Sequence, residues 1–173
     1  TAAINANLPA NQVVSGVALS DPEDVPPAVG RNDLLYEATS LPYEGGNLTI
    51  QGSGRLGTLN GVNPPTNVDD VDLLRLNVRA GTVVAVDLDL LADDLAQTPL
   101  DSVIRFFDSE GNELSGLPNP AEDTVELTAP ADGLIYIGFS GVGNGSYDPR
   151  IELSAQAGQM GTYDATISLT VPS

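Results

Sequence analysis

Alternation of apolar and polar residues from residue 46 onward is the feature that most limits what this chain can fold into. In the segment 84–90 every second residue is Val or Leu, and two of the three residues between them are Asp. A period of two places successive side chains on opposite faces of a β-strand. The same pattern recurs in the segments 47–51, 73–78, 104–106, 125–127, 135–139 and 166–171. We therefore predict an all-β chain with one buried and one solvated face on each strand.

Turn-forming residues separate these segments. Gly, Asn, Asp and Ser gather at 80–81, 109–112, 131–133 and 141–145, and these residue types favour tight turns. Short strands joined in this way are typical of an antiparallel β-sandwich or jelly roll. This is the fold that we predict.

The first 45 residues follow no such pattern. The segment 12–19 fits an edge strand, whereas 21–30 holds three prolines and three acidic residues and predicts an extended connector. One helical turn is expected at 32–38, with Asn32 or Asp33 as its cap. We therefore divide the chain into residues 1–30, an N-terminal extension or edge strand with a Pro-rich acidic connector, and residues 31–173, the sandwich domain.

The composition excludes several classes of function. The chain has 24 acidic residues against six basic ones, all of them Arg, and a formal charge of −18. Because it contains neither His nor Cys, it cannot form a Ser-His-Asp triad, a thiolate nucleophile or a zinc finger. This charge repels nucleic acid and anionic membrane surfaces, so we expect a cation as the counter-partner. Membrane insertion is not expected either, since no apolar run approaches the length of a spanning helix.

The ends and the composition also suggest a compartment. The chain begins at Thr1 and its one Met is Met160. We interpret this start as the result of signal-peptide removal or as a piece of a longer polypeptide. Together with the acidity and the lack of Cys, it favours a secreted or extracellular bacterial protein over a cytosolic one.

Several segments resemble, in their order and spacing, one bacterial domain family. They are the acidic segment 68–76, the segments 79–86, 100–114, 128–141 and 161–167, and an opening segment with Asn32, Asp33 and residues 37–39. Over about residues 30–172 the chain resembles the bacterial pre-peptidase C-terminal domain, which is related to the collagen-binding domains of clostridial collagenases. The resemblance implies a jelly-roll-like sandwich of about eight or nine strands, no catalytic activity and frequent calcium binding.

The acidic segment offers a candidate metal site. Asp69, Asp70 and Asp72 lie within four positions, just before a predicted strand. Calcium binds about six to eight oxygen ligands, and a loop that enters a strand can direct such carboxylates toward one point. The resemblance implies that Asn32 and Asp33 add oxygens from the N-terminal segment. No catalytic residue and no organic cofactor is predicted.

Other interpretations of the acidity stay open. The acidic pair that the family carries upstream of Asn32 falls here on Ala28 and Gly30. A solvated acidic loop that protects a sheet edge would also explain the cluster, and adaptation to salt would explain the missing Lys. We add Asp101 to the candidate ligands, although a role as a turn cap fits it better, and we assign Asp87 and Asp89 to a solvated sheet face.

We therefore expect a non-catalytic, calcium-binding accessory domain of a secreted protein, which aids folding, secretion or attachment. Its partners would be calcium ions and the other domains of its parent protein or an extracellular polymer. The alternative is a module of a secreted hydrolase that binds a protein fibre or a polysaccharide. Such a module needs an exposed aromatic strip, for which Tyr136 and Tyr147 are the candidates.

Overall fold

The computed structural model describes residues 12–20, 33–57, 70–90, 102–115, 124–152, 154–156, 158 and 161–173. These residues form ten strands and one short 3-10 helix. The elements are β1 (Gln12–Ala18), η2 (Leu35–Glu37), β2 (Thr39–Ser40), β3 (Leu48–Leu56), β4 (Asp72–Val78), β5 (Val83–Leu90), β6 (Ser102–Phe107), β7 (Glu113–Ser115), β8 (Thr124–Thr128), β9 (Gly133–Gly141) and β10 (Gly161–Thr170). Among the described residues, no helix is long and apolar enough to span a bilayer.

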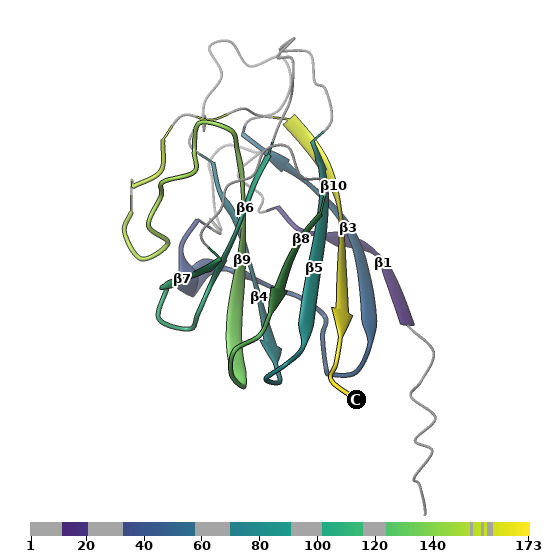
Figure 1. Cartoon of the computed structure of the whole chain (residues 1–173). Coiled ribbons are helices and arrows are strands. Elements are labelled where there is room, and N and C mark those ends of the chain that lie inside the picture. The colour runs from purple at the N-terminus through teal and green to yellow at the C-terminus, as the bar shows by residue number, and fades with distance from the viewer. Residues whose placement is uncertain are drawn as a thin grey trace, which may run out of the picture.

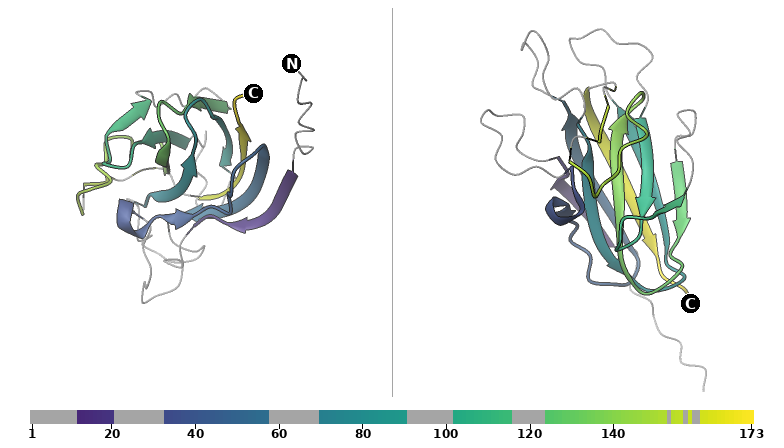
Figure 2. Two further views of the ribbon diagram at one scale, coloured as in Figure 1. Left: turned by 90° about the horizontal axis from the view of Figure 1, so that it is seen from below. Right: turned by 90° about the vertical axis from the view of Figure 1, so that its left-hand side faces the viewer.

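The strands form two five-stranded sheets that pack face to face (Figures 1 and 2). Sheet A has the order β1-β3-β10-β5-β8, and sheet B has the order β2-β4-β9-β6-β7. The prediction of an all-β sandwich is confirmed. The expected helical turn at 32–38 is η2, but its N-cap is Leu34, without a side-chain cap, and not Asn32 or Asp33. The expected edge strand at 12–19 is β1, at the edge of sheet A.

Two pairings differ from the antiparallel arrangement that we predicted. β1 pairs with β3, and β2 with β4, in parallel, whereas all other pairs are antiparallel. Parallel strands cannot be joined by a hairpin. Both exceptions involve strands from the first 40 residues, whose connections to their partners the alternation pattern does not specify.

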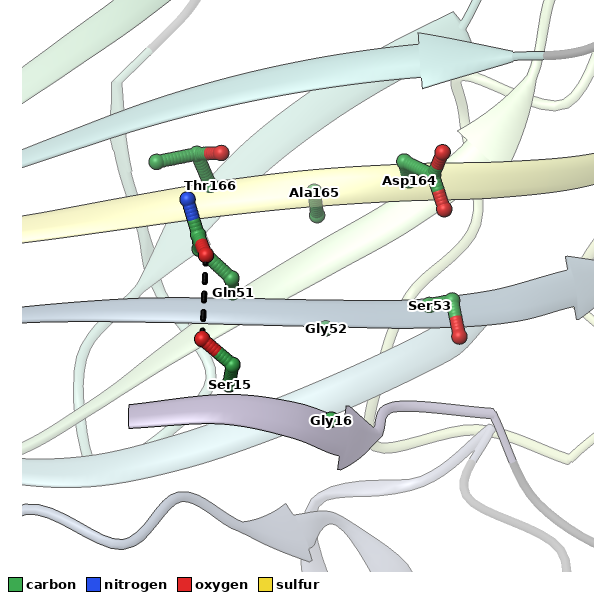
Figure 3. Close-up of a pocket in the computed structure, with 8 residues that line it drawn as sticks. All are labelled: Ser15, Gly16, Gln51, Gly52, Ser53, Asp164, Ala165 and Thr166. Carbon is green, nitrogen blue, oxygen red and sulfur yellow. Dashed lines mark hydrogen bonds between the residues drawn. The ribbon is translucent and has the colours of Figure 1, made fainter. Parts of the chain in front are cut away.

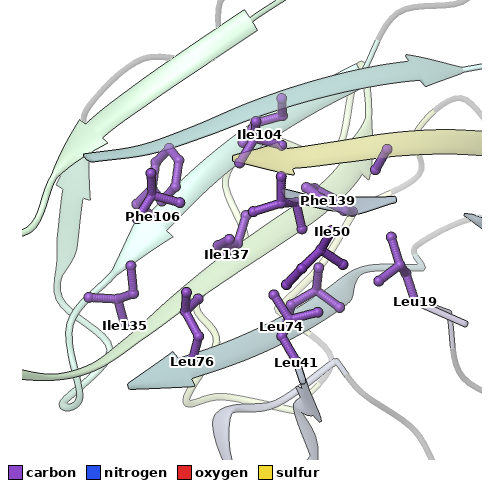
Figure 4. Close-up of a cluster of buried hydrophobic side chains, with 14 of the residues drawn as sticks. Leu19, Leu41, Ile50, Leu74, Leu76, Ile104, Phe106, Ile135, Ile137 and Phe139 are labelled. Carbon is purple, nitrogen blue, oxygen red and sulfur yellow. The ribbon is translucent and has the colours of Figure 1, made fainter. Parts of the chain in front are cut away.

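The core lies between the sheets and consists largely of the residues that the alternation marks as inward. Along β10 the odd-numbered residues from Gly161 to Leu169 are buried, and the residues between them are exposed or half-exposed. Ile50 of sheet A meets side chains of sheet B in this core (Figure 4). The sheet B residues of this core are Leu74, Leu76, Val78, Ile104, Phe106, Ile135, Ile137 and Phe139. Burial of this apolar surface is the main stabilising contribution to the sandwich.

Sheet B is also buried on its outer face, which the alternation does not predict. Phe107 of β6 and Tyr136 of β9 form a second cluster there with Leu73 and with Tyr147 from the segment after β9. The residues of β9 from 135 to 141 are therefore all buried. The segments η2 and 142–152 thus lie over sheet B, and they carry the surface features described below.

Candidate metal centre at the start of β4

The carboxylates at the start of β4 are buried and tie the two sheets together. Asp72 is 0% exposed, and its Oδ2 accepts a hydrogen bond of 2.7 Å from the hydroxyl of Tyr163 on β10. Asp70 is buried as well, and its Oδ2 accepts a bond of 2.6 Å from the amide of Gly57, directly after β3. Buried carboxylates need such donors because desolvation strongly disfavours them. Both bonds run from the β4 end of sheet B to sheet A.

The ring of Tyr163 is held in place by its neighbours. It lies opposite Gly54 in the β3–β10 register, and a Cβ at Gly54 would collide with the hydroxyl and Cζ of Tyr163. Phe139 meets the ring edge-on, with 5.5 Å between the centroids. Gly54 therefore makes the room in which the hydroxyl reaches Asp72. Nothing in the sequence around Tyr163 indicates this contact with Asp72, because the two residues are 91 positions apart.

The N-terminal segment reaches the same place. Oδ1 of Asp33 accepts a bond of 3.3 Å from the amide of Val71, between Asp70 and Asp72. The side chain of Asn144, after β9, donates to the carbonyl of Asp70 at 3.1 Å and accepts from the amide of Gln156 at 2.8 Å. Segments far apart in the sequence thus meet around residues 70–72. Asn144 was not among the predicted metal ligands, and the turn-forming residues at 141–145 do not indicate this contact.

The donors present fit a hard cation in kind. Asp33, Asp70 and Asp72 offer carboxylate oxygens, the ligand type that calcium prefers, and a hydrogen bond to one oxygen is compatible with ligation by the same carboxylate. Within the described part of the chain, however, no group of three acidic residues is placed to hold a metal ion. Asn32, Asp69 and Asp101 lie outside the described residues. Calcium binding therefore stays a prediction.

A buried arginine organises the outer face of sheet B. The guanidinium of Arg105 on β6 lies 4.8 Å from the ring centroid of Phe107 and 4.6 Å from that of Tyr147. Its Nε and Nη2 donate to Glu113 at 3.0 and 2.8 Å, and its Nη1 donates to the carbonyl of Tyr147 at 2.6 Å. Stacking and a bidentate carboxylate are contacts that suit Arg and not Lys. Arg105 thereby holds the segment after β9 against the sheet.

The tyrosines proposed for an aromatic strip do not form one. Tyr136 and Tyr147 are both buried, because the segment after β9, which carries Tyr147, folds over the sheet face on which Tyr136 lies. Burial raises the pKa of the Tyr147 hydroxyl far above its ordinary value, and within the described residues this hydroxyl has no hydrogen-bond partner. The tyrosine with a largely exposed ring is Tyr36 of η2, at 70%.

The outer face of sheet A is polar, as the alternation predicts. Asp89 is exposed and Asp87 is half-exposed, and both lie opposite polar residues of β10. On the same sheet, a shallow groove of about 370 Å³ crosses β1, β3 and β10 (Figure 3). The hydroxyl of Ser15 donates to Oε1 of Gln51 across it at 3.0 Å, and Asp164 lies further along. None of the residues that line this groove is aromatic, so the groove itself offers no stacking platform.

The comparisons with known proteins give no family assignment. No protein-family model and no curated protein matches the chain. Among solved structures, the chain is similar to PliG of Aeromonas hydrophila, described as a periplasmic inhibitor of g-type lysozyme, with 13% identity and a TM-score of 0.48 over 77% of this chain and 96% of that one. PliG of Salmonella Typhimurium is 14% identical with a TM-score of 0.42 over 77% and 97%. A PliG mutant from Escherichia coli is 13% identical with a TM-score of 0.42, and the match covers 77% of this chain and 97% of that one.

All three TM-scores lie below 0.5, so these likenesses do not bear on the function of this chain. The resemblance to the pre-peptidase C-terminal domain likewise stays a prediction from the sequence.

Substitution of Tyr163 by Phe is expected to lower the free energy of unfolding by about 1–3 kcal/mol, because it removes a donor from a fully buried carboxylate. Urea unfolding followed by circular dichroism measures this change. Tyr43→Phe is the matched control, since its hydroxyl donates to the carbonyl of Gly46 at a half-buried site where water can replace it. Equal losses of unfolding free energy in the two variants would show that the bond to Asp72 stabilises the chain no more than an ordinary half-buried hydrogen bond.

Proposed function

We propose that this chain is a non-catalytic accessory module of an exported protein, and that calcium bound at the start of β4 stabilises its fold. The observation that carries the proposal is the bond between Asp33 and the amide of Val71. It places the N-terminal segment beside the acidic segment, as a shared cation site requires. Asp33, Asp70 and Asp72, with Asn32 and Asp69, are the residues that would hold the ion.

The charge balance supports a need for cations. Arg105 pairs with Glu113 and Arg150 with Asp148, yet six Arg cannot neutralise 24 acidic residues. The remaining carboxylates repel one another and disfavour the compact state. A cation that binds the folded chain and not the unfolded chain adds its binding free energy to stability. An exported protein would meet calcium outside the cell and would be stabilised in its folded state there.

Calcium is expected to raise the melting temperature well beyond sodium chloride of equal ionic strength. At calcium about a hundredfold above its dissociation constant, linkage gives about 2.7 kcal/mol. For a domain of this size, this corresponds to a shift of about 5–10 °C. Magnesium should give a smaller shift, because it demands strict octahedral geometry and retains its waters. Thermal melts followed by circular dichroism measure the melting temperature of the same chain in each of the three salts.

The control variants separate a site from general screening. Asp33→Asn and Asp72→Asn should each abolish most of the calcium-induced shift, measured against the same variant in sodium chloride. Asp89→Asn should keep it, because Asp89 lies on the exposed face of sheet A. We compare the calcium-induced rise in melting temperature, and not the absolute melting temperature, because loss of the bond between Asp72 and Tyr163 lowers the stability of Asp72→Asn by itself. Identical melts in calcium and in matched sodium chloride would rule out the proposal.

A further inference from the structure

Three chain segments meet on one surface beside sheet B. The amide of Leu35 in η2 donates to the carbonyl of Pro149 at 3.0 Å. A Cβ at Gly111, in the turn between β6 and β7, would lie within 2.9 Å of the side chains of both Leu35 and Arg150. The segments 35–37, 108–112 and 148–152 are therefore neighbours. We call their surface the η2 face, defined by Tyr36, Glu37, Asp108, Glu110, Asp148, Arg150, Ile151 and Glu152.

The η2 face exposes apolar side chains. Tyr36 is 70% exposed and Ile151 is 56% exposed. Among the described residues, four large apolar side chains are exposed, and these are two of them. The hydroxyl of Tyr36 lies 3.5 Å from Oε1 of Glu152, which places the ring beside the segment that carries Ile151. Tyrosine is enriched at protein interfaces because it combines a large apolar ring with a polar tip.

The same face is strongly acidic. It carries five carboxylates and one guanidinium, that of Arg150. Both oxygens of Asp148 already accept bonds of 2.9 Å from this guanidinium. The pKa of the Tyr36 hydroxyl is raised, first by desolvation and then by the charges of Glu37 and Glu152. Five carboxylates thus share this face with Tyr36 and Ile151, and one guanidinium cannot pair with all of them.

We propose that the η2 face is a docking surface for a basic protein, which sets an apolar side chain against Tyr36 and Ile151 and Lys or Arg beside the carboxylates. Charge complementarity selects this occupant. Anionic membranes and nucleic acid are repelled by the net charge of −18, and so is a second copy of the chain. The proposal goes beyond the proposed function, since the η2 face includes none of the candidate calcium ligands.

The test uses the full chain and a phage-displayed library of short random peptides as the probe. Enriched peptides are expected to combine Lys or Arg with aromatic or aliphatic residues. Their affinity should fall about tenfold on Tyr36→Ala or Ile151→Ser, a loss usual for a central interface residue. Glu152→Gln should flatten the salt dependence, because it removes one charge from the face.

Val13→Ser is the matched control, because Val13 is exposed to a similar degree on β1, in the other sheet. It should change the affinity by less than about twofold. Circular dichroism checks that each variant is folded, and the calcium melts are an independent measurement. The proposal is overturned if no peptide is enriched, if acidic peptides are enriched, or if Val13→Ser weakens binding as much as Tyr36→Ala. A dimer that Tyr36→Ala dissociates would assign the face to a second copy instead.

Discussion

Substitution of Gly138 by Ala is expected to destabilise the chain by about 3 kcal/mol, at the upper end of overpacking effects. A Cβ at this position would lie 3.2 Å from Cδ2 of Leu73 and 3.2 Å from Cζ of Tyr147, and closer still to the hydroxyl of Tyr147. The ring of Tyr147 cannot easily move away, because Phe107 and Arg105 pack against it. Urea unfolding followed by circular dichroism measures the loss.

The backbone at Gly138 is equally constrained. Gly138 pairs with Leu73 on β4 and with Arg105 on β6, so it lies in the middle of sheet B with neighbours on both sides. A shift of the strand would therefore break bonds on two sides. The added methyl group has to be accommodated by strain in the side chains, which close-packed interiors tolerate poorly.

A double-mutant cycle isolates the cause. Tyr147→Phe alone should change stability by less than about 1 kcal/mol, since the hydroxyl that it removes has no bonding partner among the described residues. In the Gly138→Ala background, the same change removes the atom nearest to the new methyl group and should restore about 1 kcal/mol or more. Strictly additive effects would show that the collision with Tyr147 is not what makes glycine necessary here.

The core of the sandwich could be predicted from the sequence because each strand reports its own buried face. In β10, the inward residues Ile167 and Leu169 follow directly from the period of two in the segment 166–171. The parallel pairing of β1 with β3 could not be predicted in this way. Alternation specifies which residues of a strand face inward, but it carries no information on which strand lies next to it or in which direction.

The burial of Arg105 shows where the pattern fails. In the segment 103–106, alternation places Ile104 and Phe106 inward and Arg105 outward. Arg105 does point away from the core, yet it is buried because Tyr147 covers it from 42 positions further along the chain. Contacts at this separation leave no trace in local periodicity, so sequence patterns mark this face as solvated.

The acidic segment could be found, but its contacts could not. The cluster at 69–72 indicates where carboxylates gather, and the resemblance implies that the segment around Asp33 lies beside them. In the structure, Asp33 accepts a hydrogen bond from the amide of Val71, within this acidic segment. The partner of Asp72 is Tyr163, 91 positions away, and only the packing of sheet A on sheet B brings them together. Ligand roles for the acidic residues stay predictions for the calcium melts to test.

Substitution of Arg105 by Ala is expected to lower the free energy of unfolding by about 2–3 kcal/mol. Removal of one partner of a buried ion pair costs about 3–5 kcal/mol, but the Glu113 side chain is 31% exposed and regains part of its hydration. The change also removes the donor to the carbonyl of Tyr147 and the packing against two rings. Arg105→Lys should still lose about 1–2 kcal/mol, because an ammonium group cannot reproduce the bidentate contact.

Arg150→Ala is the matched control. Arg150 also pairs with a carboxylate, that of Asp148, but its side chain is 49% exposed, and exposed pairs contribute little to stability. We expect no measurable change in urea unfolding for this variant.

In Arg105→Ala, amide hydrogen exchange should also rise across residues 142–152, which Arg105 holds against sheet B, while β10 stays protected. Because this segment carries Ile151 of the η2 face, Arg105→Ala should weaken peptide binding there without touching a contact residue. Equal losses for the two arginines, or unchanged exchange at 142–152, would contradict the role of Arg105 as the anchor of this segment.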